Sequence, residues 1–198
     1  MQLRRLHCSP ELHLDLDAIR SEFDLPPSFP AAALAEADGL VPRDAERRDA
    51  TDVALVTIDP EGSRDLDQAV GIERRPDGWR VRYAIADVAA WVVPGGAIDQ
   101  EARARTQTFY APDRRTPLHP PSLGEGAGSL LPDGPRPAVL WTIDVDGSGE
   151  TTAIDVARAM VRSRSQLTYT EVQRSVDAGT VAVPRTDHLG VWARLRLR

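Results

Sequence analysis

The sequence predicts a mixed α/β fold whose sheet is built from antiparallel hairpins, because two pairs of strand-like segments flank strong turn sequences. The first pair, residues 68–75 and 79–86, is joined by Pro76-Asp77-Gly78, a combination typical of tight turns. The second pair, residues 139–145 and 151–161, is joined by an Asp-Gly-Ser-Gly sequence. Each pair therefore predicts two neighbouring antiparallel strands.

A further strand and three helices complete the predicted elements. Residues 53–58 are apolar and β-branched, which indicates a buried strand before the first hairpin. Residues 31–37 and 97–107 have compositions typical of helices. The sequence Thr168-x-x-Glu171 matches a capping box, so a third helix is expected to begin there and to run toward Ala178.

The composition excludes some classes of function. With 198 residues, 41% of them hydrophobic, the chain has the make-up of a soluble globular protein. No apolar run approaches the roughly 18 residues that cross a membrane, and Cys8 as the single cysteine suits the cytoplasm. The net charge is −6 and all 24 basic residues are arginines. This acidic balance disfavours a passive RNA-binding module but leaves open an enzyme that acts on nucleic acid.

Three regions of the sequence give less definite indications of secondary structure. Prolines interrupt residues 1–50, which we interpret as an N-terminal extension that leads into an exposed, charged linker at residues 43–52. Residues 114–137 hold six prolines and four glycines, which favours loops. Apolar residues between positions 189 and 197 are spaced as on one face of a helix.

Three aspartates follow the strand predicted at residues 53–58. Asp59, Asp65 and Asp67 lie within nine residues. On an extended backbone Asp65 and Asp67 point to the same side, and Gly62 allows the chain to fold Asp59 back beside them. Because like charges repel unless a cation lies between them, the spacing suggests a site for Mg²⁺ or Mn²⁺, which prefer hard oxygen ligands.

Other interpretations of these aspartates stay open on spacing alone. Asp and Gly between strands are also ordinary turn residues, because an Asp side chain hydrogen-bonds to nearby backbone. A calcium-binding EF-hand loop is disfavoured, since the segment lacks the regular alternation and the closing glutamate of that loop.

The same segment resembles a known family. Residues 57–70, TIDPEGSRDLDQAV, are similar to the signature of the ribonuclease II (RNB) family, in which a strand leads to Asp, five residues, Asp, one residue and Asp-Asp-Ala. Residues 83–132, 136–150 and 161–173 resemble the continuation of that domain in the same order. The resemblance covers residues 51–178. It implies a curved, largely antiparallel sheet with helices on its outer side.

The resemblance also implies an activity. The family consists of exoribonucleases that hydrolyse single-stranded RNA from its 3′ end to nucleoside 5′-monophosphates, with Mg²⁺ and no organic cofactor. Asp59, Asp65 and Asp67 fall on its first three signature aspartates, which bind the metal and help to position the attacking water. Asp67 matches the aspartate regarded as most critical for cleavage.

Three residues further along are candidates for contact with RNA. Tyr110 falls where the family has an aromatic residue that stacks on RNA near its 3′ end, a contact typically worth ~1–3 kcal/mol per base. The alternative for Tyr110 is a half-buried packing residue. Arg114 and Arg115 follow it and are expected either to meet phosphates or to be solvated. Asp87 is expected to be structural, closing a turn at the end of a strand.

Two departures from the family pattern bear on function. Gln68 stands where the signature usually has a fourth aspartate, so it offers the metal an oxygen but no charge. Two unit charges ~4 Å apart interact by about 4 kcal/mol at an effective dielectric near ~20, so the change weakens the expected metal site. Residues 51–198 are also shorter than the family's catalytic domain and are interpreted as its first part, with exposed sheet edges. The alternative function is a catalytically silent RNB-related RNA-binding or interaction protein.

Overall fold

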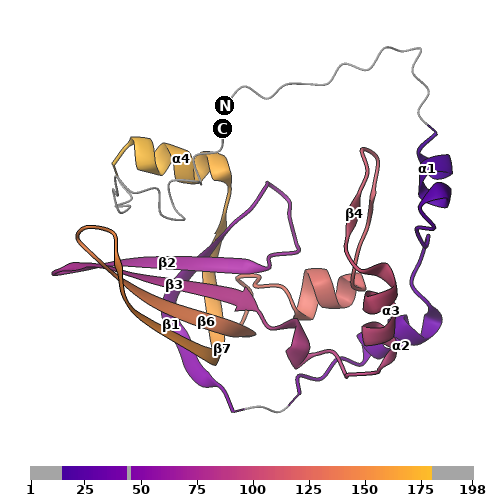
Figure 1. Ribbon diagram of the computed structural model, residues 1–198, viewed down its shortest axis with the longest axis horizontal. Coiled ribbons are helices and arrows are strands. Elements are labelled where there is room, and N and C mark those ends of the chain that lie inside the picture. The colour runs from indigo at the N-terminus through magenta and orange to yellow at the C-terminus, as the bar shows by residue number, and fades with distance from the viewer. Residues whose placement is uncertain (1–14, 44–45, 180–198) are drawn as a thin grey trace.

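Five strands of the computed structural model close into a barrel with the order β1-β2-β3-β6-β7 (Figure 1). The structure describes residues 15–43 and 46–179, so the helical pattern expected after residue 189 lies outside the described residues. The barrel strands are β1 (Arg48–Ile58), β2 (Gln68–Arg75), β3 (Gly78–Ala86), β6 (Arg136–Asp146) and β7 (Thr151–Leu167).

The pairing confirms a curved, largely antiparallel sheet and adds its closure. Neighbouring strands from β1 through β2, β3 and β6 to β7 pair antiparallel, including both predicted hairpins. The first and last strands, β1 and β7, then pair parallel to each other. The exposed sheet edges expected from the sequence are therefore absent from this five-stranded sheet, because its two outer strands pair with each other.

Strand β1 begins earlier than the apolar pattern indicated. Residues 48–52 were expected in an exposed linker, but Arg48, Asp49 and Ala50 pair with residues 159–161 of β7. Their backbone groups are satisfied by this pairing, so polar side chains on the outer face do not prevent strand formation. The expectation of a linker is wrong for these residues.

The barrel interior is filled by small and aliphatic side chains, as the narrow space inside five strands requires. The buried cluster consists of Ala50, Leu55, Leu66, Ala69, Ala84, Ala86, Leu130, Leu131, Ala138, Leu140, Ala159 and Val161. Gly71 allows β1 and β2 to approach closely, because a Cβ atom there would lie 2.4 Å from the carbonyl oxygen of Ala54. Any larger residue at position 71 would force these two strands apart.

The helices lie outside the barrel, and two of them pack together at one end of it (Figure 1). The remaining elements are α1 (Leu16–Glu22), α2 (Ala31–Asp38), η1 (Val88–Ala90), α3 (Ala97–Arg105), β4 (Phe109–Tyr110), β5 (Arg115–Thr116), η2 (Leu123–Ala127) and α4 (Tyr169–Asp177). A second buried cluster joins Ala37 of α2, Ile98 of α3 and Leu123 of η2. The predicted capping box of Thr168 and Glu171 is confirmed at the start of α4.

Glu36 of α2 caps the beginning of α3. Its Oε2 atom accepts hydrogen bonds from the backbone nitrogens of Ala97, at 2.6 Å, and Ile98, at 3.3 Å. These nitrogens belong to the first turn of a helix, where no carbonyl within the helix can accept from them.

We expect Glu36→Ala to lower the free energy of unfolding by about 1 kcal/mol, the typical effect of removing a helix cap. Urea denaturation of the two proteins measures this difference. Glu46→Ala, which removes an exposed glutamate, is the control and should leave stability unchanged. Equal effects of both substitutions would contradict the assigned cap.

His119, between β5 and η2, gives stability a dependence on pH. Burial lowers the pKa of its imidazole below the ordinary value of 6.5, so the unfolded state binds the proton more readily than the folded state. Stability from this group is present above that value and is lost as the pH falls. Between about pH 7 and about pH 5, the native chain should therefore lose more unfolding free energy than His119→Gln. Denaturation at both pH values tests this, and equal losses would contradict it.

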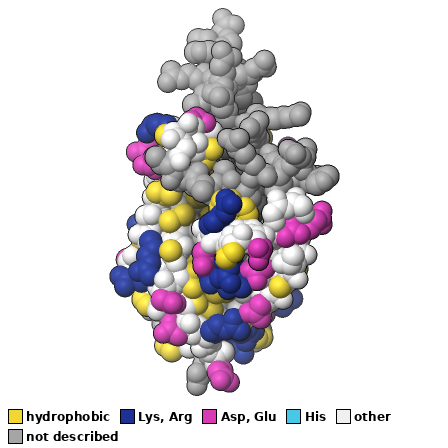
Figure 2. All heavy atoms as spheres, turned by 90° about the vertical axis from the view of Figure 1, so that its left-hand side faces the viewer, with side chains coloured by type: hydrophobic (Ala, Val, Ile, Leu, Met, Phe, Trp, Pro, Cys, Tyr) yellow, Lys and Arg dark blue, Asp and Glu magenta, His cyan; other side chains and the backbone are white. Residues whose placement is uncertain are grey.

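The hairpin tips carry charges of both signs. Arg80 binds Asp144 through two hydrogen bonds of 2.6 and 2.7 Å, and Arg82 binds Glu73 at 3.1 Å. Figure 2 shows arginine and acidic side chains interspersed on this face of the molecule. The charges compensate each other here, so this face offers no continuous basic surface for a nucleic acid.

Within the described part of the chain, no helix combines the length and the apolar character needed to cross a membrane.

Candidate active site

The acidic segment, residues 59–68, connects β1 to β2 and is tied to the barrel along its length. The backbone nitrogen of Asp59 donates to the carbonyl of Leu167 on β7 at 3.0 Å. In the middle of the segment Leu66 is fully buried, and its backbone nitrogen donates to Ser129 Oγ at 2.9 Å. At its end the carbonyl of Asp67 accepts from the nitrogen of Ala86 at 2.9 Å. The segment is therefore held at both ends and in the middle.

This anchoring directs the acidic side chains outward. Asp65 and Asp67 flank buried Leu66, so both point away from the core, as the alternation of an extended chain predicts. Asp59 and Asp65 are partly exposed, and Asp67 is exposed. The three carboxylates thus lie on the solvent side of one connection.

The carboxylates are close enough to repel one another. Desolvation and then the charge of Asp65 raise the pKa of Asp59 above its ordinary value. Desolvation, the charge of Asp65 and the charge of Asp59 raise the pKa of Asp67, although its side chain keeps contact with solvent. Each negative charge makes the next one less favourable, which is the situation that a bound cation relieves.

Asp65 already has a cationic partner. Arg115 of β5 donates from Nη1 to Asp65 Oδ2 at 2.6 Å and from Nη2 to Glu125 Oε1. The backbone of Arg115 also pairs with Tyr110 in the β4–β5 hairpin. One arginine therefore connects the acidic segment, the hairpin and η2.

The donor chemistry suits Mg²⁺, although the three carboxylates are not gathered into one ligand set. Within residues 15–43 and 46–179, no three His, Cys, Asp or Glu side chains converge closely enough to hold a metal ion. Asp65 is engaged by Arg115, and Asp59 and Asp67 do not close a ligand set with it. The residues expected to bind metal are thus neighbours with suitable oxygen ligands, and Arg115 holds one of them, Asp65, in this structure.

Gln68, the fourth expected metal ligand, is also engaged by a neighbour. Its Oε1 atom accepts a hydrogen bond from the hydroxyl of Tyr83 on β3. Burial raises the pKa of Tyr83, which keeps this hydroxyl protonated and able to donate. The oxygen that Gln68 would offer to a metal is therefore occupied by a protein donor.

Tyr110 lies at the tip of the β4–β5 hairpin and is 75% exposed. The alternative of a half-buried packing residue is therefore wrong. Beside it, a pocket of about 210 Å³ separates the hairpin from α1, with Phe23 and Phe109 among its lining residues. Aromatic side chains around a mostly apolar hollow provide faces on which a planar base can stack.

Arg114 points to α1 and not to the acidic segment. Its Nη2 atom lies 2.7 Å from Asp17 Oδ1, and Arg20 of α1 binds Asp113 of the hairpin. These ion pairs tie α1 to the hairpin that carries Tyr110. The predicted roles of Arg114 and Arg115 in RNA binding stay predictions, since neither ion pair tests them.

Asp87 is structural, as expected from the sequence. Its Oδ2 atom accepts from Arg47 Nη2 at 2.8 Å, and both side chains are buried. Its backbone nitrogen donates to the carbonyl of Pro137 at 3.0 Å. Asp87 thus joins the residues before β1 to the end of β3 through its ion pair with Arg47.

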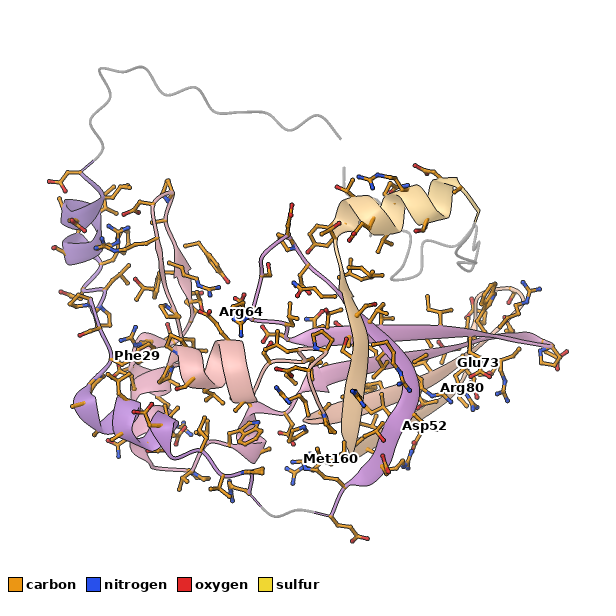
Figure 3. All side chains as sticks on the ribbon, turned by 180° about the vertical axis from the view of Figure 1, so that it is seen from behind. Phe29, Asp52, Arg64, Glu73, Arg80 and Met160 are labelled. Atoms are coloured by element: carbon orange, nitrogen blue, oxygen red, sulfur yellow. The ribbon has the colours of Figure 1, made fainter. Side chains whose placement is uncertain are left out.

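Two residues at the site were not expected from the sequence. Ser129 donates to the carbonyl of Arg64 at 2.6 Å and accepts from the nitrogen of Leu66, which fixes the segment from a loop far along the chain. Arg64 reaches toward η2, where its Nη2 atom lies 3.5 Å from the carbonyl oxygen of Glu125 (Figure 3). Both contacts join segments more than 60 residues apart, so no local pattern indicates them.

Comparisons with known proteins point to one family. A model of the RNB domain matches residues 47–195. Ribonuclease R of Acidithiobacillus ferrooxidans is 36% identical over 171 residues, which cover 84% of this chain and 38% of the relative. A protein of Arabidopsis thaliana described as inactive exonuclease DIS3L2 is 37% identical over 134 residues, which cover 66% of this chain and 12% of the relative.

A solved structure agrees with these matches. RNase R of Mycoplasma genitalium in complex with double-stranded RNA superposes with a TM-score of 0.78 at 28% sequence identity. The superposition covers 86% of this chain and 31% of that one. The chain therefore spans less than two fifths of the length of these relatives.

Proposed function

Because the chain belongs to the RNB family, we propose that it acts as a Mg²⁺-dependent exoribonuclease that hydrolyses single-stranded RNA from the 3′ end. The products would be nucleoside 5′-monophosphates. We place the activity in the cytoplasm, since a chain whose single cysteine is Cys8 needs no oxidising compartment.

One observation carries the proposal: Arg115 brings the acidic segment and the exposed aromatic residue together. Arg115 pairs with Tyr110 in the hairpin and binds Asp65 of the segment. A base that stacks on Tyr110 would therefore have its phosphate near the carboxylates. Stacking accepts every base, which suits degradation without sequence preference.

The remaining residues support the same chemistry. Asp67 is exposed, so a substrate phosphate can approach it. Asp59, Asp65 and Asp67 offer the hard oxygen ligands that Mg²⁺ and Mn²⁺ prefer, and a bound ion would supply positive charge for the phosphate and for water. Desolvation and then the charges of neighbouring carboxylates raise the pKa of Asp59 and Asp67, and a bound cation would relieve the repulsion between these charges.

The test is an RNA degradation assay with the full chain. Single-stranded RNA labelled at its 5′ end is incubated with Mg²⁺, with Mn²⁺ or with EDTA, and its length is followed over time. We expect progressive shortening with either ion and none in EDTA. Equal shortening in all three conditions would contradict metal dependence.

A catalytically silent RNA-binding protein is the second candidate, and Gln68 is the observation that favours it. Its carbonyl oxygen is bound by Tyr83, and the amide adds no charge for a metal. The likeness to a relative described as inactive exonuclease DIS3L2 is compatible with this reading. Tight RNA binding without shortening in Mg²⁺ or Mn²⁺ would select the second candidate.

A further inference from the structure

The guanidinium of Arg115 occupies the place next to Asp65 where a metal ion is expected. It lies between two carboxylates, 2.6 Å from Asp65 Oδ2 on one side and bound to Glu125 on the other. All three side chains are about one third exposed, at 31%, 33% and 28%. The ion pair is therefore shielded from water more than an ordinary surface pair, but it remains accessible to a small ion.

The position of Arg115 is set by the protein and does not depend on Asp65 alone. Its backbone pairs with Tyr110 in the β4–β5 hairpin. Its second carboxylate partner, Glu125, belongs to η2, which is joined to the acidic segment through Arg64. If the contact to Asp65 breaks, Glu125 can still hold the guanidinium nearby.

We propose that Arg115 is a positioning residue that neutralises Asp65 in the metal-free protein, and that a divalent cation binds the acidic segment by displacing Arg115 from Asp65. Arg115 stays paired with Glu125 when the cation is bound. This inference rests on the proposed metal dependence. The displacement of Arg115 explains why the expected ligands do not converge. In the metal-free protein the guanidinium of Arg115 takes the place of the metal ion beside Asp65.

Displacement has a measurable consequence for affinity. A fixed positive charge a few ångströms from a divalent cation repels it, and the ion pair with Asp65 must be broken before the metal binds. Removing the charge removes both obstacles. We expect Arg115→Gln to bind Mn²⁺ about ten-fold more tightly than the native chain, a difference of about 1.4 kcal/mol.

Two further variants separate this effect from general electrostatics. Arg114→Gln removes the same charge from the adjacent position of the same hairpin, but Arg114 binds Asp17 and not the acidic segment; its Mn²⁺ affinity should stay near the native value. Arg115→Lys keeps the charge and should also stay near it. Titration with Mn²⁺, followed by the electron paramagnetic resonance signal of the free ion, measures all four proteins.

The Mn²⁺ affinities of the four proteins decide whether Arg115 is displaced by the metal. A gain in Arg115→Gln alone supports displacement. Equal affinities in Arg115→Gln and Arg114→Gln, a gain in Arg115→Lys, or weaker binding in Arg115→Gln would overturn it. The native chain offers a second measurement that needs no variant: the ¹⁵N–¹H signal of the Arg115 side chain should shift as Mg²⁺ is added. An unchanged signal at saturating Mg²⁺ would also overturn it.

The inference and the proposed function fail in different ways. RNA shortening in Mg²⁺ together with equal Mn²⁺ affinities would leave the function intact and remove the role of Arg115. Tighter Mn²⁺ binding by Arg115→Gln without any RNA shortening would keep the role of Arg115 and favour the catalytically silent protein. No Mn²⁺ binding by any of the four proteins would overturn both.

Discussion

Asp67→Asn is expected to lower the rate of RNA shortening by about 100-fold or more, the scale seen when one group that stabilises charge in the transition state is removed. The substitution keeps the size of the side chain and leaves the backbone bond to Ala86 in place, but it removes the exposed carboxylate. Initial rates on labelled single-stranded RNA in Mg²⁺ measure the loss. Asp52→Asn is the matched control, since Asp52 is exposed on β1 and lies apart from Arg64 of the acidic segment (Figure 3); its rate should equal the native rate.

The melting temperature shows that such a loss reflects chemistry and not unfolding. Desolvation, Asp65 and Asp59 raise the pKa of Asp67, so at neutral pH its charge costs more free energy in the folded chain than in the unfolded chain. The neutral amide removes this penalty. In EDTA near neutral pH, Asp67→Asn should therefore melt no lower than the native chain. A lower melting temperature together with slower cleavage would contradict the assigned catalytic role.

Asp87→Ala is expected to lower the free energy of unfolding by about 3–5 kcal/mol, because it leaves the charge of buried Arg47 without its partner. Arg158 lies 4.0 Å from Asp87, but as a second cation it cannot neutralise the charge of Arg47 when the carboxylate is lost. Chemical denaturation measures the change. A neighbouring surface pair, Arg48 and Asp155, gives the comparison: both side chains are more than half exposed, and Asp155→Ala should change stability by less than about 1 kcal/mol.

The double variant Arg47→Met with Asp87→Leu separates the two causes of instability. It removes both charges and keeps apolar volume in the buried space, so it should recover much of the stability lost in Asp87→Ala. If the double variant is as unstable as Asp87→Ala, the unpaired buried charge does not cause the instability. The backbone hydrogen bonds around Asp87 would then be its cause.

The local elements could be predicted from the sequence because their causes are local. The Pro76-Asp77-Gly78 turn and the capping box of Thr168 and Glu171 act within a few residues, and both are confirmed. The helix α1 was missed, although Asp15 supplies a side-chain cap to the nitrogen of Ala18 at 2.9 Å. A helix of seven residues offers too short a periodic pattern to be detected.

Closure of the barrel could not be predicted in the same way. The parallel pairing of β1 with β7 joins residues that are distant in the sequence, such as Ala50 and Val161. No turn sequence indicates a contact between such distant strands. The charged residues at the start of β1 also lack the apolar pattern that predicts a strand. Their side chains lie on an exposed face of the barrel, so they need not be apolar. Backbone pairing with a distant strand decides the conformation there.

The acidic segment was predicted, but its partners were not. Three aspartates and a family signature lie within a short stretch, whereas Arg115 is 50 residues from Asp65 and Glu125 is ten residues further on. The contact between Gln68 and Tyr83 is easier to predict from the sequence. In the predicted hairpin Gln68 lies opposite Ile85, so Tyr83 is its diagonal neighbour on the adjacent strand. Register within a hairpin is accessible from sequence, and ion pairs across the fold are not.

The direction of cleavage can be measured from the order in which products appear from RNA labelled on its 3′-terminal nucleotide. The full chain is incubated with this RNA and Mg²⁺, and products are separated by length. A 3′-to-5′ exoribonuclease releases the label at once as a nucleoside 5′-monophosphate, with no labelled fragment of intermediate length. Labelled fragments of intermediate length, or label that stays on full-length RNA, would contradict the proposed activity.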